Sequence, residues 1–208
     1  MYTPDHATLE KWVSPARLAT YKDEADPVAT YFWNAELSAA FFELICHVEV
    51  LLRNAIHSQA SAWATRSGGV TPWFDDPYYG ISGRTAKNLA DAKRAAGPGA
   101  SEDKVVAELS FGFWRYLLTN HYRTTLWPRI TRGFAGLPSW DRSPSYVSEP
   151  AVRINKFRNR VAHHEPIFRA NTAQAFADLI TLAEMVDPAA ARTLWERQRI
   201  HDVMRRRP

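Results

Sequence analysis

The 208-residue sequence has one cysteine, Cys46, few lysines and no long apolar run. A single cysteine excludes an intramolecular disulfide framework and a paired-cysteine metal site. The most apolar stretch, residues 45–56, is interrupted by four polar or charged residues. It falls far short of the about 18 apolar residues that a membrane-spanning helix needs. With 46% hydrophobic and 23% charged residues, the composition is typical of a globular protein and excludes disorder as the main state.

The first ten residues, MYTPDHATLE, have neither the basic start nor the apolar run of a secretory signal. We therefore expect a cytoplasmic protein with no membrane partner. The length is that of one ordinary domain, and no repeat or low-complexity tract divides it. We expect residues 1–208 to form one domain that ends in a basic tail over about 192–208.

Arginine carries most of the positive charge, because 20 of the 26 basic residues are arginine. Its guanidinium group matches the geometry of phosphate, although a GC-rich genome would give the same bias. Residues 1–40 hold six acids and three bases (−3), whereas residues 151–170 hold five bases and one acid (+4, as for the whole chain). A polyanion would be drawn to the C-terminal third. The last residues, RRRP, could equally be a solvated chain end.

Apolar residues recur at three- and four-residue spacing almost throughout, and no segment alternates as a strand does. This pattern predicts an all-α fold, a single helical bundle. The expected helices are 28–64 (apolar stripe Leu37, Phe41, Leu44, Val48, Leu51 and Ala55), 83–96, one from Ser101 through Tyr116, 148–165, one capped by Asn171 and a last one capped by Asp187. Loops are expected at 68–77, with Trp73 and Phe74 as exposed aromatic residues, and at 133–150.

Three aromatic residues near Gly112 allow two interpretations. Phe111, Phe113 and Trp114 could stack on nucleic-acid bases, but we expect them to pack in the core. Gly112 itself indicates either a close approach by a neighbouring helix or a kink. Cys46 lies among apolar neighbours in the sequence, and we expect it to be buried and inert.

The segment KFRNRVAHHEPIF, residues 156–168, gathers arginine and histidine at the end of a predicted helix. Ile154, Phe157 and Val161 form its apolar stripe. A histidine with a pKa near neutrality can take the proton of a ribose 2′-hydroxyl or give one to the leaving 5′-oxygen. A guanidinium can hold the scissile phosphate. This chemistry needs no metal and no cofactor, because the 2′-hydroxyl is an internal nucleophile.

The positions of these side chains on an ideal helix raise a geometric problem. Asn159 and His163 share a face away from the apolar stripe, and His164 lies nearer the buried side. Arg158 and His163 are about 140° apart, so one straight helix cannot easily direct both at one atom. A second protomer, or a bend before Pro166, would bring them together.

Residues 158–163 resemble the Arg-Asn-x-x-x-His signature of HEPN-type ribonucleases. The wider chain resembles the Abi family of bacterial proteins tied to abortive phage infection, in the blocks HVEVLLRNAIH (47–57), VVAELSFGFWRYLL (105–118) and RNRVAHHEPIF (158–168). The resemblance implies a HEPN-like helical fold and a homodimer whose two protomers together form a metal-independent ribonuclease site.

By position, the resemblance implies that Arg158 binds phosphate, His163 transfers protons and Asn159 orients His163. The doubled histidine leaves open that His164 is the catalytic one, and Arg160 is a possible supporting residue. The non-catalytic alternative is a polar helix end that packs against a loop, with His164 as a hydrogen-bonded core histidine. The sequence His163-His164-Glu165 does not predict a metal site, because adjacent side chains on a helix diverge.

A second group of polar residues lies in the first of the three blocks. Glu49, Arg53 and His57 are spaced four apart, and they form either a second polar wall of the site or a surface ion-pair ladder. We favour the ladder. The other candidates for RNA binding are Asn54, Arg153 and Lys156.

These observations predict a metal-independent endoribonuclease that acts on RNA in phage defence or toxin-like growth arrest. An antitoxin or a phage-derived trigger is a possible further partner. One alternative is a non-catalytic helical module that only binds RNA or protein. Another is a sensor whose nuclease activity is gated by a phage component.

Overall fold

The computed structural model describes residues 3–69 and 71–208, and every regular element in these ranges is helical. The α-helices are α1 (His6–Val13), α2 (Pro15–Leu18), α3 (Pro27–Arg66), α4 (Gly83–Ala96), α5 (Glu102–Glu108), α6 (Phe111–Leu117), α7 (Trp127–Ile130), α8 (Pro144–Ala162), α9 (Thr172–Val186), α10 (Pro188–Arg197) and α11 (Ile200–Arg205). Short 3-10 turns are η1 (Ala19–Tyr21), η2 (Trp73–Asp75), η3 (Pro77–Tyr79), η4 (Asn120–Tyr122) and η5 (Thr131–Gly133). The predicted all-α class is confirmed. Over the described ranges, no helix combines the length and apolarity needed to cross a membrane.

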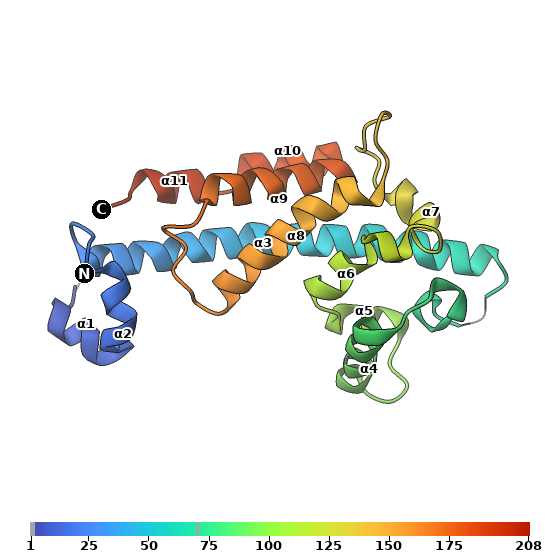
Figure 1. The fold of residues 1–208 in the computed structure, drawn as a ribbon, viewed down its shortest axis with the longest axis horizontal. Coiled ribbons are helices and arrows are strands. Elements are labelled where there is room, and N and C mark those ends of the chain that lie inside the picture. The colour runs from blue at the N-terminus through green and yellow to red at the C-terminus, as the bar shows by residue number, and fades with distance from the viewer. Residues whose placement is uncertain (1–2, 70) are drawn as a thin grey trace.

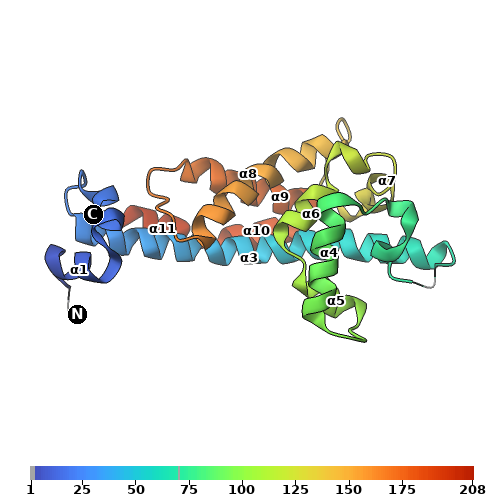
Figure 2. The same ribbon diagram turned by 60° about the horizontal axis from the view of Figure 1, so that its bottom comes forward.

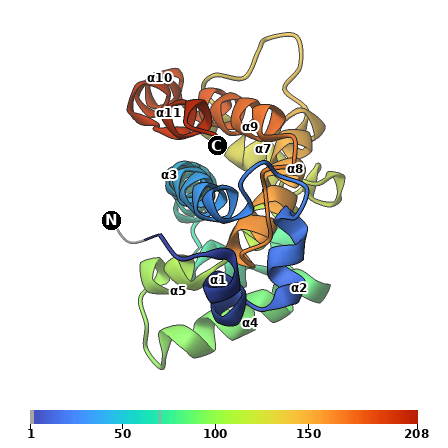
Figure 3. The ribbon, with the colours of Figure 1, turned by 90° about the vertical axis from the view of Figure 1, so that its left-hand side faces the viewer.

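The long helix α3 is the axis of the fold (Figure 1). Its 40 residues span about 60 Å. Helices α8, α9 and α11 pack along it, and α8 crosses it diagonally. Viewed along α3, helices α9, α10 and α11 lie on one side and α1, α2, α4 and α5 on the other (Figure 3). Helices α4 and α5 project from this second side next to α6 (Figure 2).

Several predicted helices are confirmed. Helix α4 has the expected bounds, and α3 differs from its predicted span by one residue at its start and two at its end. The Asn171 side chain accepts a hydrogen bond from the amide of Gln174, and Asp187 accepts one from Ala189. The apolar stripe of α3 is buried from Leu37 to Val48, but beyond that point the buried line moves to Leu52 and Ile56, and Leu51 and Ala55 are only half-buried.

Two predictions for the middle of the chain are wrong. The loop after α3 does not expose its aromatic residues, because η2 packs against α3 and leaves Trp73 and Phe74 buried. The helix from Ser101 breaks where Leu109 takes an extended conformation, so α5 and α6 are separate. The break precedes Gly112, which α8 approaches through Asn155. The core role of Phe111, Phe113 and Trp114 is confirmed.

Helix α8 begins and ends earlier than predicted. Pro144 is its first residue and Ser143 caps it, so Pro150 lies inside the helix and the expected loop is shorter. Cys46 is exposed rather than buried, because its apolar neighbours in the sequence lie on other faces of α3. Helix α10 is not the last helix, since α11 follows it.

The basic C-terminal tail is held against the acidic N-terminal part of the chain. Arg206 lies 2.6 Å from a carboxylate oxygen of Glu36, and Arg207 lies 2.9 Å from one of Glu24. The indole of Trp33 also donates a hydrogen bond to the carbonyl of Val203. The tail up to Arg207 is therefore paired with acids of the fold and is not frayed, although residues 204–208 stay exposed to solvent.

Candidate functional site

The predicted apolar stripe of α8 fixes the candidate site against α3. Ile154, Phe157 and Val161 are all buried, and the Phe157 ring packs on the Phe41 ring with centroids 4.8 Å apart. Arg158 follows Phe157 directly and therefore lies at the edge of the α3–α8 contact. Its side chain keeps 30% of its surface exposed.

The chain bends sharply after α8. The helix stops at Ala162, and His164 has a φ of 56°, a left-handed conformation that histidine seldom adopts. Arg160 holds the turn, since its guanidinium donates to the Pro166 carbonyl at 2.8 Å and lies 3.7 Å from Glu165. The bend foreseen before Pro166 is present, but the residue that it places in a pocket with Arg158 is His164 and not His163.

A buried asparagine of α3 holds the segment beyond the bend. The Asn34 side-chain oxygen accepts hydrogen bonds from the amides of Ile167 (2.9 Å) and Phe168 (3.1 Å). The Phe168 ring stacks on Tyr21, with centroids 5.0 Å apart. These contacts connect the end of α8 to both α3 and the N-terminal helices.

The bend creates a pocket of about 630 Å³ between α2, α3 and the end of α8. Its lining includes both Arg158 and His164, together with Arg17, Tyr21, Tyr31 and Phe42. His163 is not part of this lining. The expectation that His164 lies nearer the buried side is wrong, because the helix ends before it and leaves it exposed. One chain thus brings Arg158 and His164, but not His163, to the same cavity.

Arg17 and Tyr21 are pocket residues that the sequence did not indicate. The Arg17 guanidinium donates a hydrogen bond to the backbone carbonyl of His164. Burial raises the pKa of Tyr21 to about 12, so its phenol stays neutral at physiological pH. Arg17 and His164 are 147 positions apart in sequence. No local pattern could have indicated this contact.

Glu49 supplies the counter-charge for Arg158. Its Oε2 lies 3.9 Å from Arg158 Nε, and this buried Nε makes no hydrogen bond within the described part of the chain. Burial raises the pKa of Glu49, while Arg158 and the backbone of Phe111 act in the opposite direction. Glu49 therefore contacts a pocket residue, Arg158, although Glu49 is not itself part of the pocket lining.

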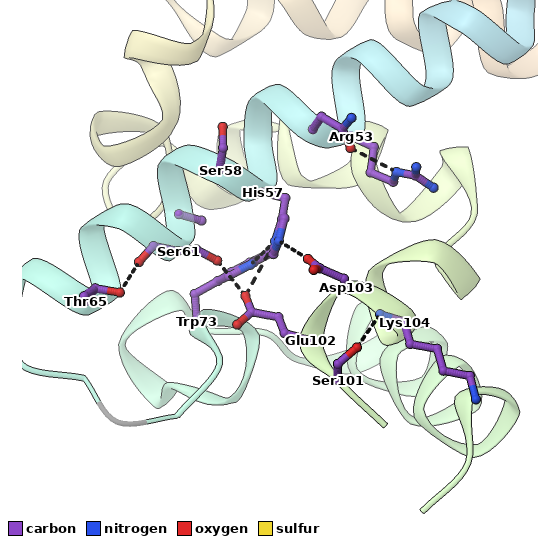
Figure 4. Close-up of polar contacts among 12 residues, drawn as sticks. Arg53, His57, Ser58, Ser61, Thr65, Trp73, Ser101, Glu102, Asp103 and Lys104 are labelled. Atoms are coloured by element: carbon purple, nitrogen blue, oxygen red, sulfur yellow. Dashed lines mark hydrogen bonds and ion pairs between the residues drawn. The ribbon is translucent and has the colours of Figure 1, made fainter. Parts of the chain in front are cut away.

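The favoured ion-pair ladder is wrong, because its three members have different partners. His57 lies among Trp73, Glu102 and Asp103 (Figure 4). The Trp73 indole donates a hydrogen bond to His57 Nδ1 at 3.1 Å, and His57 Nε2 lies 3.5 Å from an Asp103 oxygen. Arg53 instead donates to the side chain of Asn54, at a long 3.4 Å. This His57 cluster attaches α5 to α3 and lies apart from the pocket at the end of α8.

The remaining candidates differ in their partners. Arg153 makes two 2.8 Å hydrogen bonds to the buried carboxylate of Asp178. The backbone carbonyl of Asn159 accepts from the His163 amide at 2.9 Å, but no side-chain hydrogen bond between these two residues occurs in the described ranges. Lys156 is exposed and forms no ion pair with any described residue. Arg153 is thus committed to a structural pair, whereas Lys156 is free to meet a ligand.

In residues 3–69 and 71–208, no three His, Cys, Asp or Glu side chains are grouped so that they could hold a metal ion. The chain was also compared with protein-family models, curated proteins and solved structures, and none of them matches it. The likeness to the Abi family and to HEPN-type ribonucleases therefore rests on the three sequence blocks alone.

Proposed function

We propose that this protein is a metal-independent endoribonuclease whose site is the pocket at the end of α8. One observation carries the proposal: Arg158 and His164 line the same cavity of about 630 Å³. This volume suits a small ligand or one unit of a longer chain. Tyr31 and Phe42 of the same lining offer aromatic faces for a base.

The cavity supports cleavage by transfer to the neighbouring 2′-hydroxyl. The imidazole of His164 takes the 2′-hydroxyl proton, and the 2′-oxygen forms a bond to phosphorus. The bond from phosphorus to the 5′-oxygen breaks, that oxygen takes a proton from solvent water, and the His164 imidazolium returns its proton to the solvent. The products end in a 2′,3′-cyclic phosphate and a 5′-hydroxyl. Proton transfer of this kind contributes about 10² to 10⁴ in rate.

Arg158 binds the non-bridging oxygens of the scissile phosphate and stabilises the charge that builds on them. Fixed donors of this kind contribute about 10² to 10³ in rate. In the free protein, Glu49 neutralises the guanidinium. RNA must displace or share this contact, which is a 3.9 Å approach and not a hydrogen bond at Arg158 Nε.

The biological part of the proposal rests on the resemblance to the Abi family. We place the activity in the cytoplasm, in phage defence or toxin-like growth arrest, with a homodimer and a possible antitoxin or phage-derived trigger as partners. The rival function is a non-catalytic RNA-binding module. It is favoured by the fact that Arg158 pairs with Glu49 and forms no described hydrogen bond with either histidine.

The test compares the wild-type protein with Arg158→Ala on total RNA in excess EDTA, followed by mapping of the fragment 3′ ends. Arg66→Ala is the control, because it removes the same charge from an exposed position at the end of α3. The proposal expects EDTA-resistant cleavage that leaves cyclic phosphates, a loss of about 10² or more in Arg158→Ala and an unchanged rate in the control. Intact RNA that both wild type and Arg158→Ala bind equally would overturn it in favour of the binding module.

A further inference from the structure

A second, smaller pocket lies between α4 and α6. Its volume is about 310 Å³, and its lining includes Arg84, Thr85 and Asn88 from α4 and Gly112, Arg115 and Tyr116 from α6. None of the described residues that line it is acidic. Neither arginine forms an ion pair with any residue in 3–69 or 71–208, so the pocket holds two uncompensated positive charges.

Buried donors without acceptors accompany these charges. Thr85 as a residue is 2% exposed, and its hydroxyl makes no hydrogen bond in the described structure. Arg115 Nε is also buried and unpaired. The Tyr122 hydroxyl lies outside the pocket lining. Burial raises the Tyr122 pKa and the nearby Thr85 side chain acts in the opposite direction, but the two hydroxyls do not reach hydrogen-bond geometry. Because buried donors without acceptors are costly, their grouping indicates a missing acceptor.

The start of α4 adds a favourable field for an anion. Arg84 and Thr85 are the second and third residues of this 14-residue helix, and its N-cap Ser82 makes no capping hydrogen bond through its side chain. The first amides of a helix and its dipole both favour negative charge at this end. The ligand that suits the two guanidinium groups, the Thr85 hydroxyl and the start of α4 is an anion rich in acceptor oxygens.

We propose that this pocket binds a phosphate group, and that the phosphate belongs to an RNA chain that also reaches the pocket at the end of α8. The second half of this proposal rests on the proposed ribonuclease function. Helix α6 contacts α8 at Gly112, because a Cβ atom added there would lie 3.7 Å from the Asn155 side-chain oxygen. Asn155 precedes Arg158 by less than one helical turn. One RNA strand along α8 can therefore reach both pockets.

The first test measures binding of inorganic phosphate to the full-length protein by calorimetry. Arg84→Gln should weaken binding about tenfold, as expected for the loss of one charge-assisted hydrogen bond. Lys87→Gln is the matched control, because it removes the same charge from an exposed position on the same helix outside the pocket lining. Thr85→Val keeps the side-chain shape, removes the unpaired hydroxyl and should also weaken phosphate binding. No phosphate binding, or equal weakening by Arg84→Gln and Lys87→Gln, would overturn the phosphate site.

The second test identifies the source of the phosphate with a 2′-O-methyl RNA, which cannot be cleaved by 2′-hydroxyl attack. Arg84→Gln should lower the RNA affinity more than Lys87→Gln does. Unchanged RNA affinity in Arg84→Gln, with phosphate binding lost, would overturn RNA as the source. The two proposals fail separately, since absence of cleavage with phosphate binding intact contradicts only the ribonuclease.

Discussion

The pocket at the end of α8 and the pocket between α4 and α6 both contain two arginines, but these arginines have different neighbours. At the end of α8, Arg158 lies 3.9 Å from a Glu49 oxygen, and Arg17 donates to the carbonyl of His164. Between α4 and α6, Arg84 and Arg115 face no acid among the described lining residues. In the first pocket, both arginines have partners within the chain and lie near His164. In the second pocket, the arginines have no counter-charge and are available to bind an anion. The recognisable motif lies at the first pocket, and the free charge lies at the second.

The same difference appears within residues 151–170. Their net charge of +4 is largely compensated by acids from elsewhere in the chain, since Arg153 pairs with Asp178 and Arg169 lies 3.4 Å from Glu24. A sum of charges along the sequence therefore overstates the positive field of this segment. Whether an arginine is available depends on its tertiary neighbours.

The largest expected effect separates the two histidines of the motif. His164→Asn should lower the single-turnover cleavage rate by about 10² to 10⁴, because it removes the proton-transferring group that lines the pocket with Arg158. Asparagine tolerates the left-handed backbone at this position, so the bend is retained. His163→Asn is the matched variant and should cause a much smaller loss. The reverse order would favour His163 of the Arg-Asn-x-x-x-His signature and a site completed by a second protomer.

The next effect is on stability, and it distinguishes a committed arginine from a free one. Arg153→Ala should lower the free energy of unfolding by about 1–3 kcal/mol in urea titrations, because the buried Asp178 loses two 2.8 Å hydrogen bonds. RNA affinity should stay near that of the wild type. Addition of Asp178→Asn should recover part of the stability, since it removes the uncompensated charge. Weaker RNA binding with normal stability in Arg153→Ala would instead indicate that Arg153 belongs to the RNA-binding surface.

Local chemistry explains which parts of the fold could be predicted. The caps Asn171 and Asp187 and the bounds of α4 follow from residues within one turn of each helix end. Their interactions are short-range, so the sequence pattern is sufficient. The break at Leu109 was missed because the helical spacing of apolar residues continues across it, although the helical backbone conformation does not.

The candidate site was only half predictable, for a related reason. Arg158 was identified from its motif, but the path of the chain beyond α8 depends on Asn34, which lies 133 positions before Ile167. Once the helix ends at Ala162, the side-chain positions expected from an ideal helix no longer apply to the two histidines that follow. The pocket between α4 and α6 shows no motif at all, because its donors come from separate helices.

A smaller effect tests the counter-charge at Arg158. Glu49→Gln should tighten binding of non-cleavable RNA about two- to fivefold at neutral pH, because it frees the guanidinium. Burial raises the pKa of Glu49, so protonation of Glu49 in the wild type has the same effect as pH falls. An ordinary glutamate has a pKa of about 4.3. As the pH is lowered, the affinity difference between the two proteins should therefore disappear before the pH reaches that value. The two proteins differ only at position 49, so the contributions of all other groups cancel in this comparison. A difference that persists at low pH would contradict the Glu49–Arg158 contact.

The smallest effect concerns the salt dependence of RNA binding. Lys156→Gln should lower the slope of log affinity against log salt concentration by about 0.7, the value for one phosphate contact with a single strand. Arg169→Gln removes an equal charge from the same segment, but this arginine already lies near Glu24 and Asp23. It should therefore change the slope much less. Equal changes in the two variants would mean that the total charge of the segment, and not the pairing of each side chain, determines how RNA is attracted to the end of α8.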